Sequence, residues 1–121
     1  MALTHQDNAR NTMVNAVTAL ANSGSLIFYQ ADTTTPVATI VLGNPAFGAA
    51  VAGVATAEGL PLVDTNVAGG TTTNFKIRTS GAAEVLSGLV NTSGADINLS
   101  STTLNNGDQL SISTLTYTAG A

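Results

Sequence analysis

The chain has 121 residues, of which 44% are hydrophobic, 8% are charged and 4% are aromatic, and its formal net charge at pH 7 is −4. This length suits one domain with a hydrophobic core, and so low a charge content excludes a typical disordered chain. Binding to nucleic acid or to an anionic membrane surface depends on Lys and Arg, so a chain with three of these residues is expected to bind neither.

The first predicted element is an amphipathic helix over residues 4–22. Its apolar residues recur at helical spacing and are expected to pack on a sheet, and Gly24 is a natural stop. The apolar face consists of Ala9, Met13, Ala16, Val17 and Leu20. Residues 1–24 contain neither a basic leader nor a continuous apolar run, so we expect no signal peptide and no membrane span.

From residue 25 to residue 118 the sequence predicts a β-sandwich or barrel of about seven or eight strands. The polar residues are mostly Thr, Ser, Asn and Gly. Thr favours strands through its branched Cβ, whereas Gly and Asn favour turns. The predicted strands before residue 91 are Ser25–Ala31, Val37–Leu42, Ala49–Thr56, Leu60–Val63, Thr71–Thr79 and Ala83–Val90.

Two turn signals organise the second half of the chain. Ser80-Gly81 is expected to join the last two of those strands in a hairpin. Asn106-Gly107 is the strongest hairpin signal in the chain and leads into a strand over Gln109–Thr118. Residues 1–121 are therefore predicted to form a single, mainly β domain with one N-terminal helix.

Candidate catalytic and metal-binding residues are few. His5 is the single histidine and Cys is absent, so neither a zinc site nor a serine triad is expected. Glu58 and Asp64 could flank a glycosidase cleft, although we favour their interpretation as solvated loop acids. A loop calcium site that uses Asp96 and backbone carbonyls stays open. We therefore expect no enzyme activity and no cofactor, and apart from this open calcium site we predict no metal-binding residue.

The segment from residue 101 to residue 118 has one charged residue, Asp108, among many hydroxyl and amide side chains. The buried centres of protein interfaces are likewise depleted in charge. Neutral hydroxyl and amide groups can hydrogen-bond across a contact without the cost of burying ions. This composition favours a protein whose surface is covered by neighbours in a repeating assembly.

Five short motifs are distributed over nearly the whole chain: Leu26–Tyr29, Asn44–Ala49, Thr92–Leu99, Gly107-Asp108 and Leu115–Thr118. Together with the Asn- and Ala-rich helix before them, they resemble the pattern of a family of small bacteriophage virion proteins. Thr92–Leu99 (TSGADINL) is the most specific part of the resemblance. The first turn, Asp32–Pro36, and the position of Thr72 depart from the family pattern.

The resemblance implies a structural protein of a phage particle, made in the host cytoplasm and located in the virion. We expect a capsid decoration (cement) protein on the outer capsid surface, where it covers junctions of the major capsid protein and self-associates as a trimer. Pro45, Phe47, Pro61 and Leu62 are the predicted contacts with that partner, weighed against loops folded onto the protein's own core. The alternatives are a tail or fibre component and an adhesin-like module that binds another surface.

Overall fold

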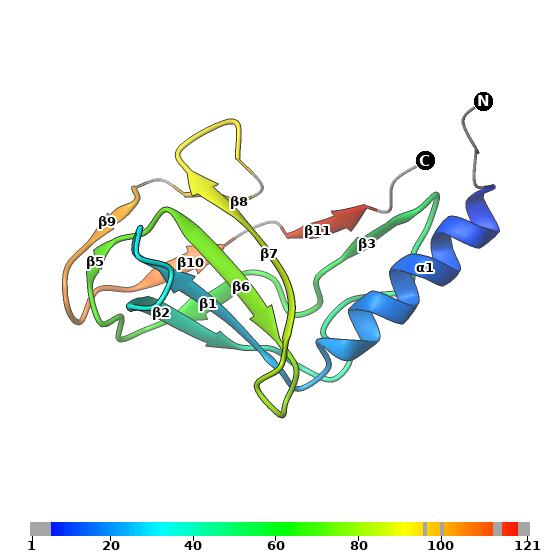
Figure 1. Cartoon of the computed structure of the whole chain (residues 1–121), viewed down its shortest axis with the longest axis horizontal. Helices are drawn as coiled ribbons and strands as arrows, with labels where there is room; N and C mark the ends of the chain where they lie inside the picture. Colours follow the sequence, from blue (N-terminus) through cyan, green and yellow to red (C-terminus); the bar gives the residue numbers. More distant parts are fainter. Residues whose placement is uncertain (1–5, 96, 100, 113–114, 119–121) are drawn as a thin grey trace.

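The computed structural model describes residues 6–95, 97–99, 101–112 and 115–118. It is mainly β, with one N-terminal helix and a curled multi-stranded sheet (Figure 1), which confirms the predicted fold class. The described residues form eleven strands, more than the seven or eight predicted. Several are only two or three residues long, because stretches predicted as one strand are divided between different partners.

The largest element is a five-stranded sheet in the order β2-β1-β6-β7-β8. All its pairs are antiparallel except β7–β8, which is parallel. The hairpin predicted at Ser80-Gly81 is confirmed, since β6 and β7 pair directly on either side of it. The strands of this sheet are β1 Ser25–Tyr29, β2 Pro36–Val41, β6 Asn74–Arg78, β7 Glu84–Asn91 and β8 Ile97–Asn98.

Three short antiparallel ribbons complete the fold: β3 with β11, β4 with β10, and β5 with β9. Their bounds are β3 Val54–Thr56, β4 Leu62–Asp64, β5 Gly70–Thr71, β9 Thr103–Leu104, β10 Leu110–Ile112 and β11 Thr116–Thr118. Asn106-Gly107 forms the predicted turn, but the expected hairpin is wrong. The strands on either side of the turn pair with β5 and β4 instead of with each other, and the Gly107 N–H bonds to the Val67 carbonyl.

The core lies between the inner face of the five-stranded sheet and the ribbons. Leu26, Phe28 and Ile77 project from the sheet and are almost completely buried. Ala55 of β3 and Leu110 of β10 belong to the same buried cluster. On the opposite, outer face of β1, Tyr29 is buried but Ser25 and Ile27 are only half-buried.

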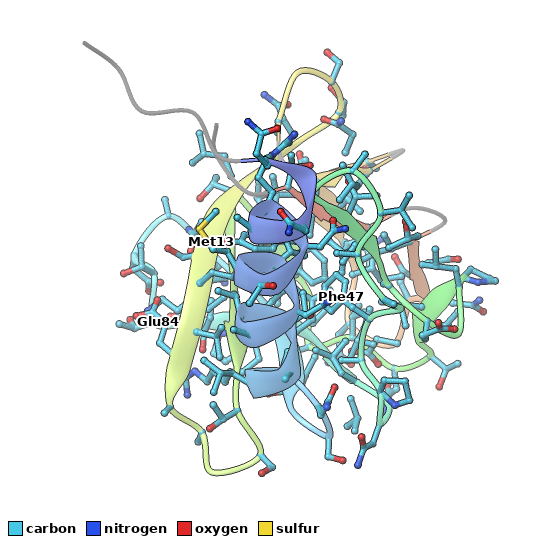
Figure 2. The ribbon with its side chains drawn as sticks, turned by 90° about the vertical axis from the view of Figure 1, so that its right-hand side faces the viewer. Met13, Phe47 and Glu84 are labelled. Atoms are coloured by element: carbon cyan, nitrogen blue, oxygen red, sulfur yellow. The ribbon has the colours of Figure 1, made fainter. Side chains whose placement is uncertain are left out.

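Helix α1 spans Asp7–Leu20, shorter at both ends than the predicted 4–22; residues 4 and 5 lie outside the described part. It contacts β3 and β11, and it forms one end of the molecule (Figures 1 and 2). The predicted buried face is largely wrong. The helix residues packed inward are Val14, Val17, Thr18 and Ala21, whereas Met13, Ala16 and Leu20 are exposed.

Gly24 follows the helix as expected, but for a different reason from the one expected. The residue with left-handed backbone angles is Ser23, with φ 57°. At Gly24 the backbone of β6 comes so close that an added Cβ would lie 1.9 Å from the Arg78 carbonyl oxygen. Only glycine lets the chain pass this point and enter β1.

Candidate functional site

Three asparagines of the helix region bind the backbone of the loop that precedes β3. Their side-chain oxygens accept hydrogen bonds from successive N–H groups along that loop: Asn22 from Ala46 at 2.9 Å, Asn15 from Ala50 at 2.9 Å, and Asn11 from Gly53 at 2.8 Å. These bonds turn a polar face of the helix toward the protein. The sequence signal is Asn recurring four residues apart at 11 and 15, outside the predicted apolar face of the helix.

The rotation of the helix leaves an apolar stripe in solvent. Met13 is 36% exposed and Leu20 is 56% exposed, Ala16 is also exposed, and Ala9 is half-buried. In Figure 2 the Met13 side chain extends from the helix on the side of β7, whereas Phe47 lies on the other side. We call Ala9, Met13, Ala16 and Leu20 the helix stripe.

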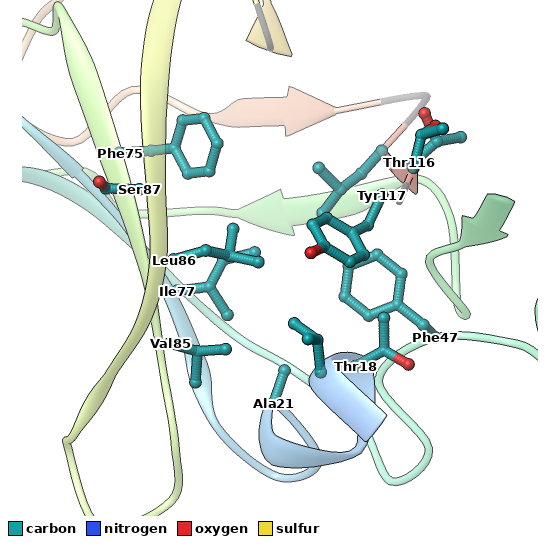
Figure 3. A pocket seen from close by; sticks show the side chains of 13 residues that line it. Thr18, Ala21, Phe47, Phe75, Ile77, Val85, Leu86, Ser87, Thr116 and Tyr117 are labelled. Atoms are coloured by element: carbon teal, nitrogen blue, oxygen red, sulfur yellow. The ribbon is translucent and has the colours of Figure 1, made fainter. Parts of the chain in front are cut away.

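A cavity of about 420 Å³ lies between the helix, the five-stranded sheet and β11 (Figure 3). Its walls combine apolar side chains with Thr and Ser side chains, and the Tyr117 ring projects into it from β11. Val17 of the helix and Val85 of β7 both line the cavity, so it borders the helix that carries the stripe. The other lining residues are Thr18, Ala21, Phe47, Phe75, Ile77, Leu86, Ser87, Leu115, Thr116 and Thr118.

The four predicted contact residues separate into two classes. Phe47 and Leu62 belong to the buried core, so their side chains are folded onto the protein itself. Pro45 and Pro61 are exposed and stay predicted contacts. Phe47 also lines the cavity beside the helix, which the sequence analysis did not foresee.

The two acids considered for a glycosidase have structural neighbours. Asp64 accepts hydrogen bonds from the N–H of Thr39 at 2.9 Å and from the N–H of Asn66 at 3.0 Å, one at each carboxylate oxygen. Glu58 is exposed and lies over Gly48, where an added Cβ would be 2.8 Å from its Oε1. Asp64 therefore joins two backbone segments by hydrogen bonds, which is a structural role for a carboxylate.

Asp32 forms the turn between β1 and β2. The Thr35 hydroxyl donates to its carboxylate, and so do the backbone N–H groups of Thr34 and Thr35. Hydrogen bonds of this kind favour the ionised form. They lower the pKa of Asp32 below its ordinary value of 3.8, with the Thr35 side chain as the largest cause.

The outer face of the five-stranded sheet is open to solvent and holds two of the three cations. Lys76 Nζ lies 5.1 Å and Arg78 Cζ 5.9 Å from the centre of the Tyr29 ring, within cation–π range. Val41 of β2 and Leu89 of β7 lie on the same face and are 78% and 65% exposed. This outer face therefore combines exposed apolar side chains with cations held against an aromatic ring.

The hydroxyl-rich segment after residue 100 presents neutral groups. The Oγ1 atoms of Thr71 and Thr103 are 3.1 Å apart across β5 and β9. The one charge, Asp108, accepts a 2.9 Å hydrogen bond from the Asn105 N–H inside its own turn. The exposed side chains of Ser111, Thr116 and Thr118 carry no charge.

Within the described residues, no group of three or more His, Asp or Glu side chains is arranged to hold a metal ion. His5 and Asp96, which the sequence analysis considered for metal sites, lie outside the described part. The described part also contains no helix whose length and hydropathy would allow it to cross a membrane.

Comparisons of the chain with protein-family models, with curated proteins and with solved structures found no match.

Proposed function

We propose that this chain is a structural protein of a bacteriophage particle. Its specific role in this proposal is that of a capsid decoration protein, bound as a trimer over junctions of the major capsid protein on the outer surface. It works by contact alone, without a catalytic step, a cofactor or nucleic acid. The resemblance of its motifs to small virion proteins suggests the phage particle. The exposed apolar side chains on its surface favour a protein that is covered by neighbouring subunits.

One observation carries the proposal. Two separate faces leave large apolar side chains in solvent: Met13 and Leu20 on the helix, and Val41 and Leu89 on the outer sheet face. The whole chain has only three basic and seven acidic residues, so little surface charge is available to keep such faces of different molecules apart. Soluble monomers normally avoid contiguous exposed apolar surface and use mixed charges instead. Exposed apolar groups on two faces suit a subunit that is covered from more than one side.

The rest of the molecule fits this role. The antiparallel pairing, the buried cluster and the hydrogen-bonded loop before β3 make a rigid body that can bind identically at many sites. The acidic net charge of −4 suits a protein outside a shell better than one that faces packaged DNA. Pro45 and Pro61 lie in exposed loops available to a partner.

The deciding experiment is to locate the chain in particles released from cells that produce it. We expect purified particles to retain the protein, and an electron cryo-microscopy map to show this fold at many equivalent capsid sites. A ring of a few copies on the tail would exclude capsid decoration and retain the structural role. Complete absence from the particles would overturn the proposal.

A further inference from the structure

We infer that helix α1 is a self-association surface, on which the helix stripe packs against the same stripe of a second copy of this chain. The inference rests on the proposed structural role and adds to its trimer a contact between two copies of this chain. It is drawn from the spacing, exposure, charge and position of Ala9, Met13, Ala16 and Leu20.

The spacing of the stripe is that of a helix-pairing seam. Its members follow each other after four, three and four residues, which is the a/d repeat of packed helices. In an isolated domain such a seam normally faces the core. Here Val14, Thr18 and Ala21 face the core instead, and the seam faces outward.

The stripe and its flanks are uncharged, which makes an identical stripe a suitable partner. The flanking residues Thr12, Val17 and Ala19 are uncharged. Arg10, the one basic residue of the helix, packs its guanidinium against Gly53, where an added Cβ would be 2.6 Å from its Cζ. An uncharged seam offers no ion pair to a charged partner, and it meets no like-charge repulsion from an identical seam.

The position of the helix allows the contact. It is the outermost element at one end of the molecule (Figures 1 and 2), so two copies can bring their helices together without a clash between their sheets. The cavity walls at Val17 and Val85 lie beside the stripe, and a second copy would cover this apolar region as well. The Met13 side chain extends from the helix on the side of β7.

The size of the contact sets its strength. A helix of 14 residues is about 21 Å long, and one such seam buries less than the roughly 800 Å² per partner of a stable interface. The contact is therefore weak in dilute solution and becomes populated at high local concentration, as on a particle surface.

The first test measures self-association of the purified chain by sedimentation equilibrium up to millimolar concentration. We expect Leu20→Glu and Met13→Glu to weaken association by about tenfold or more, because a charge enters the seam. The matched control is Val51→Glu, a change at a 74% exposed apolar residue that is not part of the stripe but of the loop bound by Asn11 and Asn15, which should leave association unchanged. Leu20 and the control residue are more than half exposed in the single chain, so their variants should leave the melting temperature of the monomer nearly unchanged.

The second test uses the absence of native cysteine. In a parallel pair, Ala16→Cys should form a disulfide-linked dimer with itself. In an antiparallel pair, Ala16→Cys should cross-link to Met13→Cys instead, because facing Cα atoms must lie within about 7 Å. Ser80→Cys, in the exposed turn between β6 and β7, is the control that should not cross-link.

Three results would overturn the inference: a chain that stays monomeric at millimolar concentration, association that the stripe variants do not weaken, or equal cross-linking of the Ser80→Cys control. Loss of particle attachment in Leu20→Glu without any self-association of the wild type would assign the stripe to another protein, which also contradicts it. In each case, the presence of the chain in particles remains a separate observation that tests the proposed function alone.

Discussion

The side-chain oxygen of Asn15 accepts a 2.9 Å hydrogen bond from the backbone N–H of Ala50, thirty-five residues along the chain. This bond lies between those of Asn11 and Asn22, and together they fix which face of the helix turns inward. The exposure of the helix stripe is the direct consequence.

Replacing Asn15 by Ala should therefore destabilise the protein. The Ala50 N–H is part-buried and would lose its acceptor, which costs about 1–2 kcal/mol. Thermal unfolding should show a melting temperature lower by about 4–8 °C. Gln109→Ala, at an exposed amide, is the control and should have no effect. An unchanged melting temperature in the Asn15 variant would mean that this bond does not hold the loop.

Gly24→Ala should be among the most damaging substitutions in the chain. The added Cβ would overlap the Arg78 carbonyl oxygen at 1.9 Å, so β1 and β6 would have to separate where the chain leaves the helix. We expect a loss of several kcal/mol of unfolding free energy, or failure to fold, seen by circular dichroism and thermal melting. Gly43→Ala, whose Cβ would be 3.6 Å from its nearest neighbour, should be tolerated. Equal stability of the two variants would contradict this account.

Asp32 should make stability depend on pH in the acid range. Its folded-state pKa lies below the ordinary value of 3.8, so its stabilising effect is fully present above that value and is lost as pH falls through the lower, folded-state pKa. Asp32→Asn removes the titrating group. The difference in melting temperature between wild type and variant should shrink between about pH 6 and about pH 2. A difference that is constant with pH would exclude this role for Asp32.

Attachment to the particle should be insensitive to salt. Lys76 and Arg78 lie over the Tyr29 ring, and Arg10 packs at Gly53, so few charges are placed to form ion pairs with a partner. Raising salt from about 0.1 M to about 1 M screens ion pairs but not apolar contacts. Sedimentation of washed particles should recover the chain with them at both concentrations. Its release from intact particles at high salt would show that ion pairs hold it.

The hairpin expected at Asn106-Gly107 shows that local sequence signals predict a turn but not the pairing of the strands on either side of it. The two residues form a turn, as their preference for positive φ predicts, and Gly107 has φ 88°. What the strands do after the turn depends on which neighbours lie within reach. Here β9 pairs with β5 and β10 pairs with β4, so the turn connects two ribbons instead of closing one.

The contact predictions show a similar division. Pro45 and Pro61 are exposed, as residues of turns usually are, and proline punctuates loops whatever surrounds it. Phe47 and Leu62 are buried, because the core of a small β domain takes the large apolar side chains within its reach. No local pattern distinguishes a loop phenylalanine that is covered by its own domain from one that is offered to a partner.

Local pattern alone determined the mainly β class, the single N-terminal helix, the strands β1 and β2, and the β6–β7 hairpin. Each of these depends on the period of apolar residues or on turn residues a few positions apart. The rotation of the helix and the pairing of the short strands were decided only by tertiary structure. An asparagine side chain on a helix can hydrogen-bond equally well to water or to a distant backbone N–H. Only the folded chain brings that N–H to it.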